Sequence, residues 1–241
     1  LQQWQRSLAE GRAEERRFSF AYPYGLIHAQ LSADDLANFR IRFERLRILM
    51  PSGLLVDFPE NAELPPLDIK RHLEKSRGTL NVSLAVPLWS PERANTIEQD
   101  RLQDAAIKLL FRLKERDVPD ENTGENPKPV AFRRLNARLV PGDEDTSEME
   151  TVPLLRIMQA AGEDVGLPKQ DPNFAPPCFF ISGSPVLRKL LRDLASQVEA
   201  SRSELANQIT KGGFSMETLR GAQLEQLLRL QVLNRFAGIL P

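Results

Sequence analysis

The sequence predicts a mainly β N-terminal domain followed by an α-helical domain. Before residue 182, apolar residues recur at every second position in several short segments, which is the period of a half-buried strand. Many prolines stand at the ends of these runs, where a residue without an N–H costs no ladder hydrogen bond. After that point the apolar spacing changes to steps of three and four, as on one face of a helix. The predicted domains are therefore residues 1–182 and 183–241.

The composition excludes several classes of protein. The 241 residues suffice for one large or two small domains, and the net charge of −1 predicts no general attraction to nucleic acid or anionic membranes. A single cysteine, Cys178, excludes an internal disulfide framework and favours a reducing compartment such as the cytoplasm. No apolar run reaches the roughly 18 residues of a membrane span, and no signal peptide opens the chain.

The first segment predicts a short polar helix and then a strand. Residues 1–17 are rich in charged and amide side chains, which is typical of an exposed helix. Aromatic residues then occupy every second position from Phe18 to Tyr24, before Gly25 turns the chain. This alternation predicts a strand ahead of the turn.

Residues 39–58 predict a β-hairpin with an irregular first strand. Its apolar residues stand at odd positions up to Phe43 and at even positions from Leu46 onward. Because a one-residue slip turns every later side chain to the opposite face of the sheet, we expect a β-bulge near Glu44–Arg45. The sequence Pro51-Ser52-Gly53 is a tight-turn signal that leads into the second strand.

Four further segments predict strands, and one segment is ambiguous. The strands are expected at residues 79–87 (TLNVSLAVP), 130–140 (VAFRRLNARLV), 152–158 (VPLLRIM) and 176–181 (PPCFFI). The segment from Ile97 to Arg116 fits two periods. Leu109 and Leu113 belong to a helical spacing, but with Phe111 they also alternate as in a strand.

The helical domain is expected to begin at Ser184-Pro185, because serine caps a helix and proline suits its first turn. Gly212-Gly213 ends the first helix, and Ser215 can cap a second. A heptad-like apolar stripe follows the first helix and consists of Leu187, Leu191, Leu194, Val198 and Leu205. The second helix spreads its apolar residues over a wider face than one neighbour can cover. Intrachain packing of the two helices and self-association both remain open, and we favour self-association.

The sequence contains no recognised motif for catalysis or cofactor binding. His28 and His72 have no partner at metal-ligand spacing, and Cys178 reads as a small buried hydrophobe. The acidic run at residues 142–150 (GDEDTSEME) lacks the glycine and the bidentate glutamate of a calcium loop, so we interpret it as a solvated turn. We therefore expect a protein that is not an enzyme, with no metal and no cofactor.

The basic strand at residues 39–47 is the strongest nucleic-acid candidate, because its arginines alternate with apolar residues. These arginines are Arg40, Arg42, Arg45 and Arg47. In a regular strand they point away from the aromatic side chains, so no base could use both. We interpret the strand as a solvated face, with a protein contact as the second reading and nucleic acid as the last.

Five segments occur in an order and spacing that a known family shares. They are residues 24–59 with the aromatic-Gly-Leu entry and the Pro-x-Gly turn, 64–69 (LPPLDI), 79–87, 135–157 with the acidic turn, and 171–194 (DPNFAPPCFFISGSPVLRKLLRDL). In the last segment the family pattern is carried by Asp171, Phe174, Pro176 and Pro177. Together the segments resemble the TssK family, baseplate subunits of the bacterial type VI secretion system.

The resemblance implies a β-sandwich shoulder, similar to receptor-binding proteins of phage baseplates, and an α-helical neck that assembles a homotrimer. Members are non-enzymatic structural adaptors. Their shoulder holds the baseplate proteins TssF and TssG, and a C-terminal head docks on the TssL and TssM membrane complex. The family's opening segment and its head lie outside residues 1–241, so we expect this chain to bind baseplate proteins and not the membrane complex.

The resemblance also implies a location and a local structure. The location is the cytoplasm, at the inner face of the inner membrane of a Gram-negative bacterium, with no nucleic acid as partner. The local structure is strand rather than helix around Lys108 to Arg116.

Two other functions remain as alternatives. The first is a receptor- or carbohydrate-binding module of a phage-like baseplate, although two tryptophans and two tyrosines offer little surface for sugar stacking. The second is a hydrolase with an unfamiliar site, which would require Asp34, Asp35 or Glu44 to meet a histidine in a deep pocket.

Overall fold

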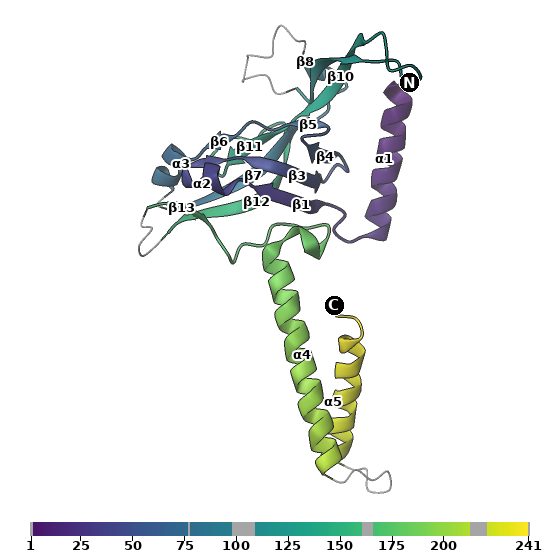
Figure 1. Ribbon diagram of the computed structural model, residues 1–241, viewed down its shortest axis with the longest axis vertical. Helices are drawn as coiled ribbons and strands as arrows, with labels where there is room; N and C mark the ends of the chain where they lie inside the picture. Colours follow the sequence, from purple (N-terminus) through teal and green to yellow (C-terminus); the bar gives the residue numbers. More distant parts are fainter. Residues whose placement is uncertain (1, 77, 98–108, 161–165, 213–220, 241) are drawn as a thin grey trace. The chain divides into compact units, whose positions relative to one another are not determined.

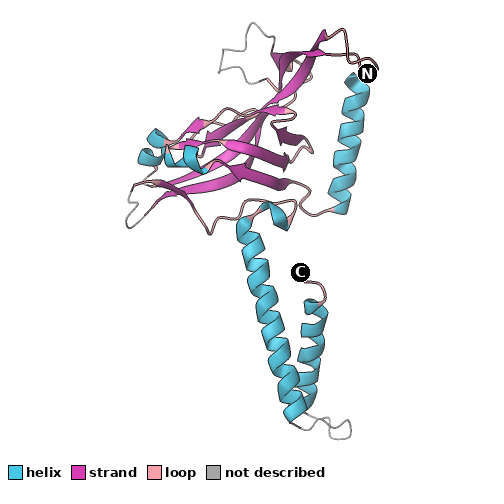
Figure 2. Ribbon diagram, viewed as in Figure 1, coloured by secondary structure: helices cyan, strands magenta, loops and turns pink. Residues whose placement is uncertain are grey.

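The computed structural model describes residues 2–76, 78–97, 109–160, 166–212 and 221–240 (Figure 1). Contacts divide the chain into two compact units, Leu1–Ser184 and Pro185–Pro241, which are described separately below. Strand and helix each make up about 34% of the chain, so the chain as a whole is mixed and has the helical C-terminal part that the sequence predicts (Figure 2).

Unit 1 begins with helix α1 (Gln2–Ser19), as predicted. The helix contacts the rest of the unit near both of its ends: Arg6 stacks over the Trp89 ring at 4.1 Å, and Arg16 Nη2 donates to the Gly53 carbonyl at 3.0 Å. The strand predicted from Phe18 to Tyr24 is wrong. Helix α1 runs through Ser19, and the following residues form no ladder, because alternation alone gives no strand without a neighbour to pair with.

The first sheet consists of β1 (Gly25–Leu31), β3 (Phe43–Leu49) and β4 (Leu55–Phe58), in the order β1-β3-β4. All of its pairs are antiparallel. Gln30 pairs with Arg45 and Leu31 with Phe43, so Glu44 is the extra residue of a β-bulge, as predicted. The predicted turn also forms: the Gly53 amide donates to the Met50 carbonyl, and Gly53 adopts φ +88°.

The second sheet has the strand order β11-β7-β12-β13. Its strands are β7 (Thr79–Pro87), β11 (Arg138–Pro141), β12 (Met149–Gln159) and β13 (Pro168–Gln170). β7 and β12 contain two of the predicted strands, and the acidic run forms the turn between β11 and β12.

A third sheet has the order β5-β10-β9-β8. Its strands are β5 (Ala62–Glu63), β8 (Thr96–Ile97), β9 (Phe111–Val118) and β10 (Lys128–Asn136). The strand reading around 111–116 is therefore confirmed, while residues 98–108 of the ambiguous segment lie outside the described part. A pair of β2 (Arg40–Ile41) and β6 (Leu67–Asp68) completes the strands, with the short helices α2 (Ala33–Ala37) and α3 (Lys70–Lys75) beside them.

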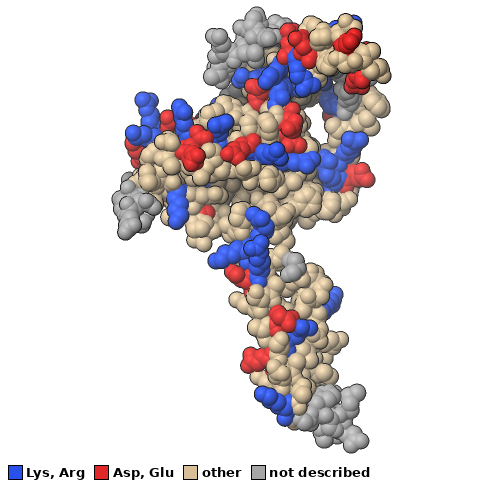
Figure 3. All heavy atoms as spheres, viewed as in Figure 1, with Lys and Arg blue, Asp and Glu red and all other residues tan. Residues whose placement is uncertain are grey.

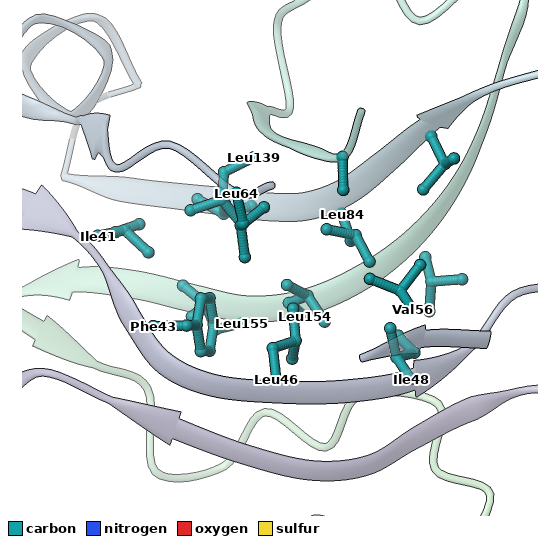
Figure 4. Packing of buried hydrophobic residues seen from close by; sticks show 14 of the residues in the cluster. Ile41, Phe43, Leu46, Ile48, Val56, Leu64, Leu84, Leu139, Leu154 and Leu155 are labelled. Carbon is teal, nitrogen blue, oxygen red and sulfur yellow. The ribbon is translucent and has the colours of Figure 1, made fainter. Parts of the chain in front are cut away.

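One hydrophobic core draws side chains from the first two sheets. In this core, Leu46 and Ile48 of β3 lie close to Leu84 of β7 and Leu154 of β12 (Figure 4). The side chains of Leu46, Ile48 and Leu84 have no solvent exposure. The odd-to-even change of parity at Glu44 keeps both halves of β3 facing this core. Within the described ranges the strands form four sheets, and the β-sandwich stays a prediction.

The strand predicted at residues 176–181 is wrong. Cys178 makes an isolated bridge to Leu26, and residues 181–183 form a 3-10 turn, η3 (Ile181–Gly183). Pro176 and Pro177 have no N–H, so this segment could not form a continuous ladder beside β1. It is fixed by single hydrogen bonds, from the Leu26 amide to the Pro177 carbonyl and from the Phe179 amide to the Leu26 carbonyl.

Unit 2 is a helical hairpin of α4 (Pro185–Lys211) and α5 (Ala222–Ala237). The first helix starts at the proline of the Ser184-Pro185 step and ends before Gly212, as predicted. The predicted cap at Ser215 lies outside the described residues. At about 1.5 Å per residue, α4 is roughly 40 Å long and α5 roughly 24 Å, so the N-terminal part of α4 extends beyond α5 (Figure 1).

Candidate interaction surfaces

The predicted apolar stripe of α4 remains accessible to solvent in the single chain. Of its members, Leu187, Leu191, Val198 and Leu205 are half-buried, and Leu194 is 48% exposed. None of the residues of α4 is buried. Amphipathic helices of folded domains ordinarily bury their apolar face, whereas this 27-residue helix has no buried residue.

The C-terminal part of the stripe faces α5, as the intrachain reading expected. Leu205 lines a cavity of about 550 Å³ together with Leu228, Val232 and Leu233 of α5. Glu204 and Arg229 stand on its walls. Leu187 and Leu191 are not among the residues that line this cavity. The structure therefore brings Leu205 to α5, and the other four stripe residues do not line this cavity.

Helix α5 carries more apolar surface than α4 covers. Leu224, Leu228, Val232 and Phe236 are each between 41% and 53% exposed. Leu228 and Val232 are half exposed although they line the cavity with α4, which shows how incompletely one neighbour covers them. A helix with large apolar side chains in contact with water on several sides is typical of a bundle with more members.

Three of the groups weighed for chemistry, Asp35, Glu44 and His72, are held in structural contacts. Asp35 accepts from the Ser32 hydroxyl at 2.7 Å and lies 3.6 Å from Arg42, while Glu44 accepts from the Gln30 amide. His72 contacts Asp143 of the acidic turn at 3.2 Å. Within the described residues no cluster of three or more His, Cys, Asp or Glu side chains could hold a metal ion.

Cys178 is not poised as a nucleophile. Its thiol is half-buried and donates to the Pro176 carbonyl at 3.2 Å. Desolvation by burial raises the pKa of the Cys178 thiol. A raised pKa lowers the fraction of thiolate, which is the reactive form.

The acidic turn is tied to its neighbours by ion pairs rather than left open for a cation. Glu144 pairs with Arg138 at 2.6 Å, and Glu148 pairs with Arg93 at 3.1 Å. On the basic strand, Arg47 pairs with Asp57 of β4 at 3.3 Å. These contacts support the reading of both segments as solvated surface.

The hairpin of β9 and β10 carries another charged surface, which the sequence analysis did not identify. Residues 128–133 are exposed one after another, so neither face of this part of the hairpin is covered. The sequence does contain a pattern that indicates this surface: basic residues occupy every second position, at Arg112, Lys114 and Arg116. The competing helical spacing in the same segment concealed that alternation.

Comparison with known proteins places the chain in a family. A family model described as "Bacterial Type VI secretion, VC_A0110, EvfL, ImpJ, VasE" matches residues 1–241. The chain belongs to this family. The resemblance predicted from the sequence segments is thereby confirmed.

Solved TssK structures have the same fold as this type VI secretion protein. A TssK-TssF-TssG baseplate subcomplex matches with a TM-score of 0.79 and 24% identity, over 98% of this chain and 72% of that chain. TssK from EAEC in complex with a nanobody matches with a TM-score of 0.78 and 22% identity, over 100% and 77%. A crystal structure of TssK matches with a TM-score of 0.82 and 21% identity, over 99% of this chain and 52% of that one.

The chain is accordingly a member of a bacterial type VI secretion family and has the fold of the solved TssK structures. No curated protein matches the sequence. Among the helices in the described ranges, none is long and apolar enough to span a membrane.

Proposed function

We propose that this chain is a non-enzymatic structural adaptor whose helical unit associates with two further copies to form a homotrimer. The observation that carries the proposal is that α4 has no buried residue, although it has an apolar stripe along its length. Leu205 is the stripe residue that lines the cavity with α5. A trimeric bundle would cover Leu191, Leu194 and Val198 with equivalent residues of other copies.

The exposed apolar surface of α5 supports the same proposal. Leu228 and Val232 are half exposed while they line the cavity with α4. Insertion of apolar side chains from another copy would remove that surface from water, at about 25 cal/mol per Å² buried. Surface on both helices favours a bundle of several hairpins over a single pair of helices.

The β-rich unit is the proposed binding site for the baseplate proteins TssF and TssG. One of the similar structures is a TssK-TssF-TssG subcomplex, and the match covers 98% of this chain. Three copies of unit 1 on one trimeric neck would add modest contacts through their effective concentration. Attachment to TssL and TssM at the inner face of the inner membrane is proposed for the longer family members, through the head.

Sedimentation of residues 1–241 tests the proposal directly. A trimer has about three times the mass of the 27.2 kDa chain. We expect this mass at micromolar concentration, and a heavier complex when TssF and TssG from the same bacterium are added. The mass of a single chain would reject self-association through unit 2. A trimer that binds neither TssF nor TssG would reject unit 1 as their binding site.

A further inference from the structure

The hairpin of β9 and β10 has two faces of opposite chemistry, and its register defines them. Lys128 pairs with Val118, Phe132 with Lys114, and Arg134 with Arg112, so even-numbered residues of both strands share one face. Two contacts agree with this parity. Arg116 stacks over Phe132 at 4.8 Å on the even face, and Arg133 stacks over Phe111 at 5.0 Å on the odd face.

Every charged residue on the even face is basic. We call this surface the basic face; its members are Arg112, Lys114, Arg116, Val118, Lys128, Val130, Phe132 and Arg134. The odd face instead carries Glu115 and Asp117 beside Arg133. Figure 3 shows Lys and Arg side chains gathered over this part of unit 1.

Several of these cations have no internal counter-charge. Among the described residues, Lys114, Arg116 and Lys128 form no ion pair, and all three are exposed. Arg134, by contrast, donates to the Ala62 carbonyl at 2.6 Å and pairs with Glu63 at 3.7 Å. The exposed cations and the exposed Phe132 ring therefore remain for an external partner.

A cavity of about 370 Å³ adjoins the basic face at its base. Its apolar lining includes Phe58, Pro59, Leu64 and Pro65, and its basic lining consists of Arg112, Lys114 and Arg134. A ligand that fills it would offer an apolar side chain next to a negative group. A polypeptide commonly has an apolar side chain next to a carboxylate, whereas a phosphate backbone has no apolar side chain beside its charges.

We propose that the basic face docks an extended acidic segment of a partner protein. Same-face residues of a strand are roughly 6.5–7 Å apart, so Lys114 and Arg116 match carboxylates two positions apart in an extended chain. A neighbouring apolar side chain of that segment enters the cavity. A polypeptide fits better than a phosphate backbone, because it can place an apolar side chain in the cavity beside its carboxylates.

This inference goes beyond the proposed function, since it concerns one surface of unit 1 and does not require the helices to associate. The probe is a fluorescein-labelled ten-residue peptide with glutamate at alternate positions, serine between them and one leucine. Fluorescence anisotropy on residues 1–241 would measure its affinity. The comparison probes are the same peptide with lysine for glutamate, an isomer with contiguous glutamates, and a mixed-sequence DNA duplex.

Lys114→Glu and Arg133→Glu form a matched pair, because each changes the charge by the same amount on opposite faces of one hairpin. We expect Lys114→Glu to weaken acidic-peptide binding about threefold, and the double variant K114E/R116E at least about tenfold, since attraction becomes repulsion. Arg133→Glu should change affinity less than about twofold. Binding should also weaken with salt, while thermal unfolding of each variant shows that the hairpin is intact.

Three results would overturn the proposal. The first is equal binding of the glutamate and lysine peptides. The second is equal loss of binding in Lys114→Glu and Arg133→Glu. The third is a DNA duplex that binds more tightly than the acidic peptide and loses its affinity in K114E/R116E, which would assign the face to nucleic acid. Weaker binding of the contiguous-glutamate isomer would support the alternate spacing.

Discussion

The Glu150 carboxylate accepts two hydrogen bonds from Ser52, one from its hydroxyl at 2.6 Å and one from its backbone amide at 3.0 Å. Ser52 lies in the turn between β3 and β4, and Glu150 lies on β12 of the other core sheet. The pair therefore links two sheets from residues that are 98 positions apart. The α1 helix contacts the same turn through Arg16, so three elements meet there.

Replacement of Glu150 by alanine should loosen this junction. We expect Glu150→Ala to lower the free energy of unfolding of unit 1 by about 1 kcal/mol, the usual scale of an exposed charge-assisted hydrogen bond. Glu121→Ala, in an exposed loop, is the control and should change it by less than about 0.5 kcal/mol. Urea unfolding measures both, and equal values for the two variants would contradict the role given to Glu150.

Gly25 should tolerate no side chain. It adopts φ +128°, and a Cβ there would lie 2.7 Å from the Pro177 carbonyl oxygen. Because both strain and overlap oppose it, we expect Gly25→Ala to destabilise unit 1 by about 2–4 kcal/mol. Gly11→Ala in α1 is the matched control: nothing lies within 4 Å of its Cβ position, and we expect stabilisation of about 0.5–1 kcal/mol. Thermal unfolding that ranks the two variants in the reverse order would refute this account.

The sequence predicted the structure correctly where it depends on which positions of a strand are apolar. It was misleading where the structure depends on whether a neighbouring strand is available to pair. The bulge at Glu44 was predictable, because the side-chain period of a strand is fixed and the apolar residues change parity there. The segments 18–24 and 176–181 had strand-like composition, but whether a segment pairs depends on which neighbour the fold supplies. Neither outcome can be read from the segment itself.

The candidate surfaces followed the same rule. The stripe through Leu191 and Val198 could be predicted from the heptad-like spacing of its apolar residues. Which of these residues face α5 depends on where the second helix ends. The basic face was missed because its cations become one surface only when β9 and β10 pair in their observed register. Sequence patterns indicate which residues share a face, and tertiary structure decides what covers it.

Cys178 should react slowly with alkylating agents in the folded protein. Burial raises the pKa of its thiol, so the thiolate fraction at pH 8 is lower than in an unfolded chain. We expect iodoacetamide labelling at pH 8 to be several-fold slower than in guanidinium chloride, and to accelerate at higher pH. Mass spectrometry of quenched samples gives both rates; equal rates in the two states would show that the thiol is not desolvated.

The self-association surface can be tested by two charges placed on the α4 stripe. Leu191 and Val198 are seven residues apart and therefore share one face of the helix, and both are half-buried in the single chain. In an assembled bundle they would be cut off from water, and a buried unpaired carboxylate costs several kcal/mol. We expect the double variant L191E/V198E to be monomeric in light scattering, while circular dichroism still shows its helices.

The matched control for this variant is S196E/S203E, which adds the same charge at exposed positions of α4 away from the stripe. At 100° per residue, Ser196 lies on the side of the helix opposite Leu191 and Val198. The control should keep the mass of the unchanged protein. A folded L191E/V198E variant with that same mass would reject the stripe as the interface. Loss of assembly in both variants would show instead that added charge anywhere on α4 prevents association.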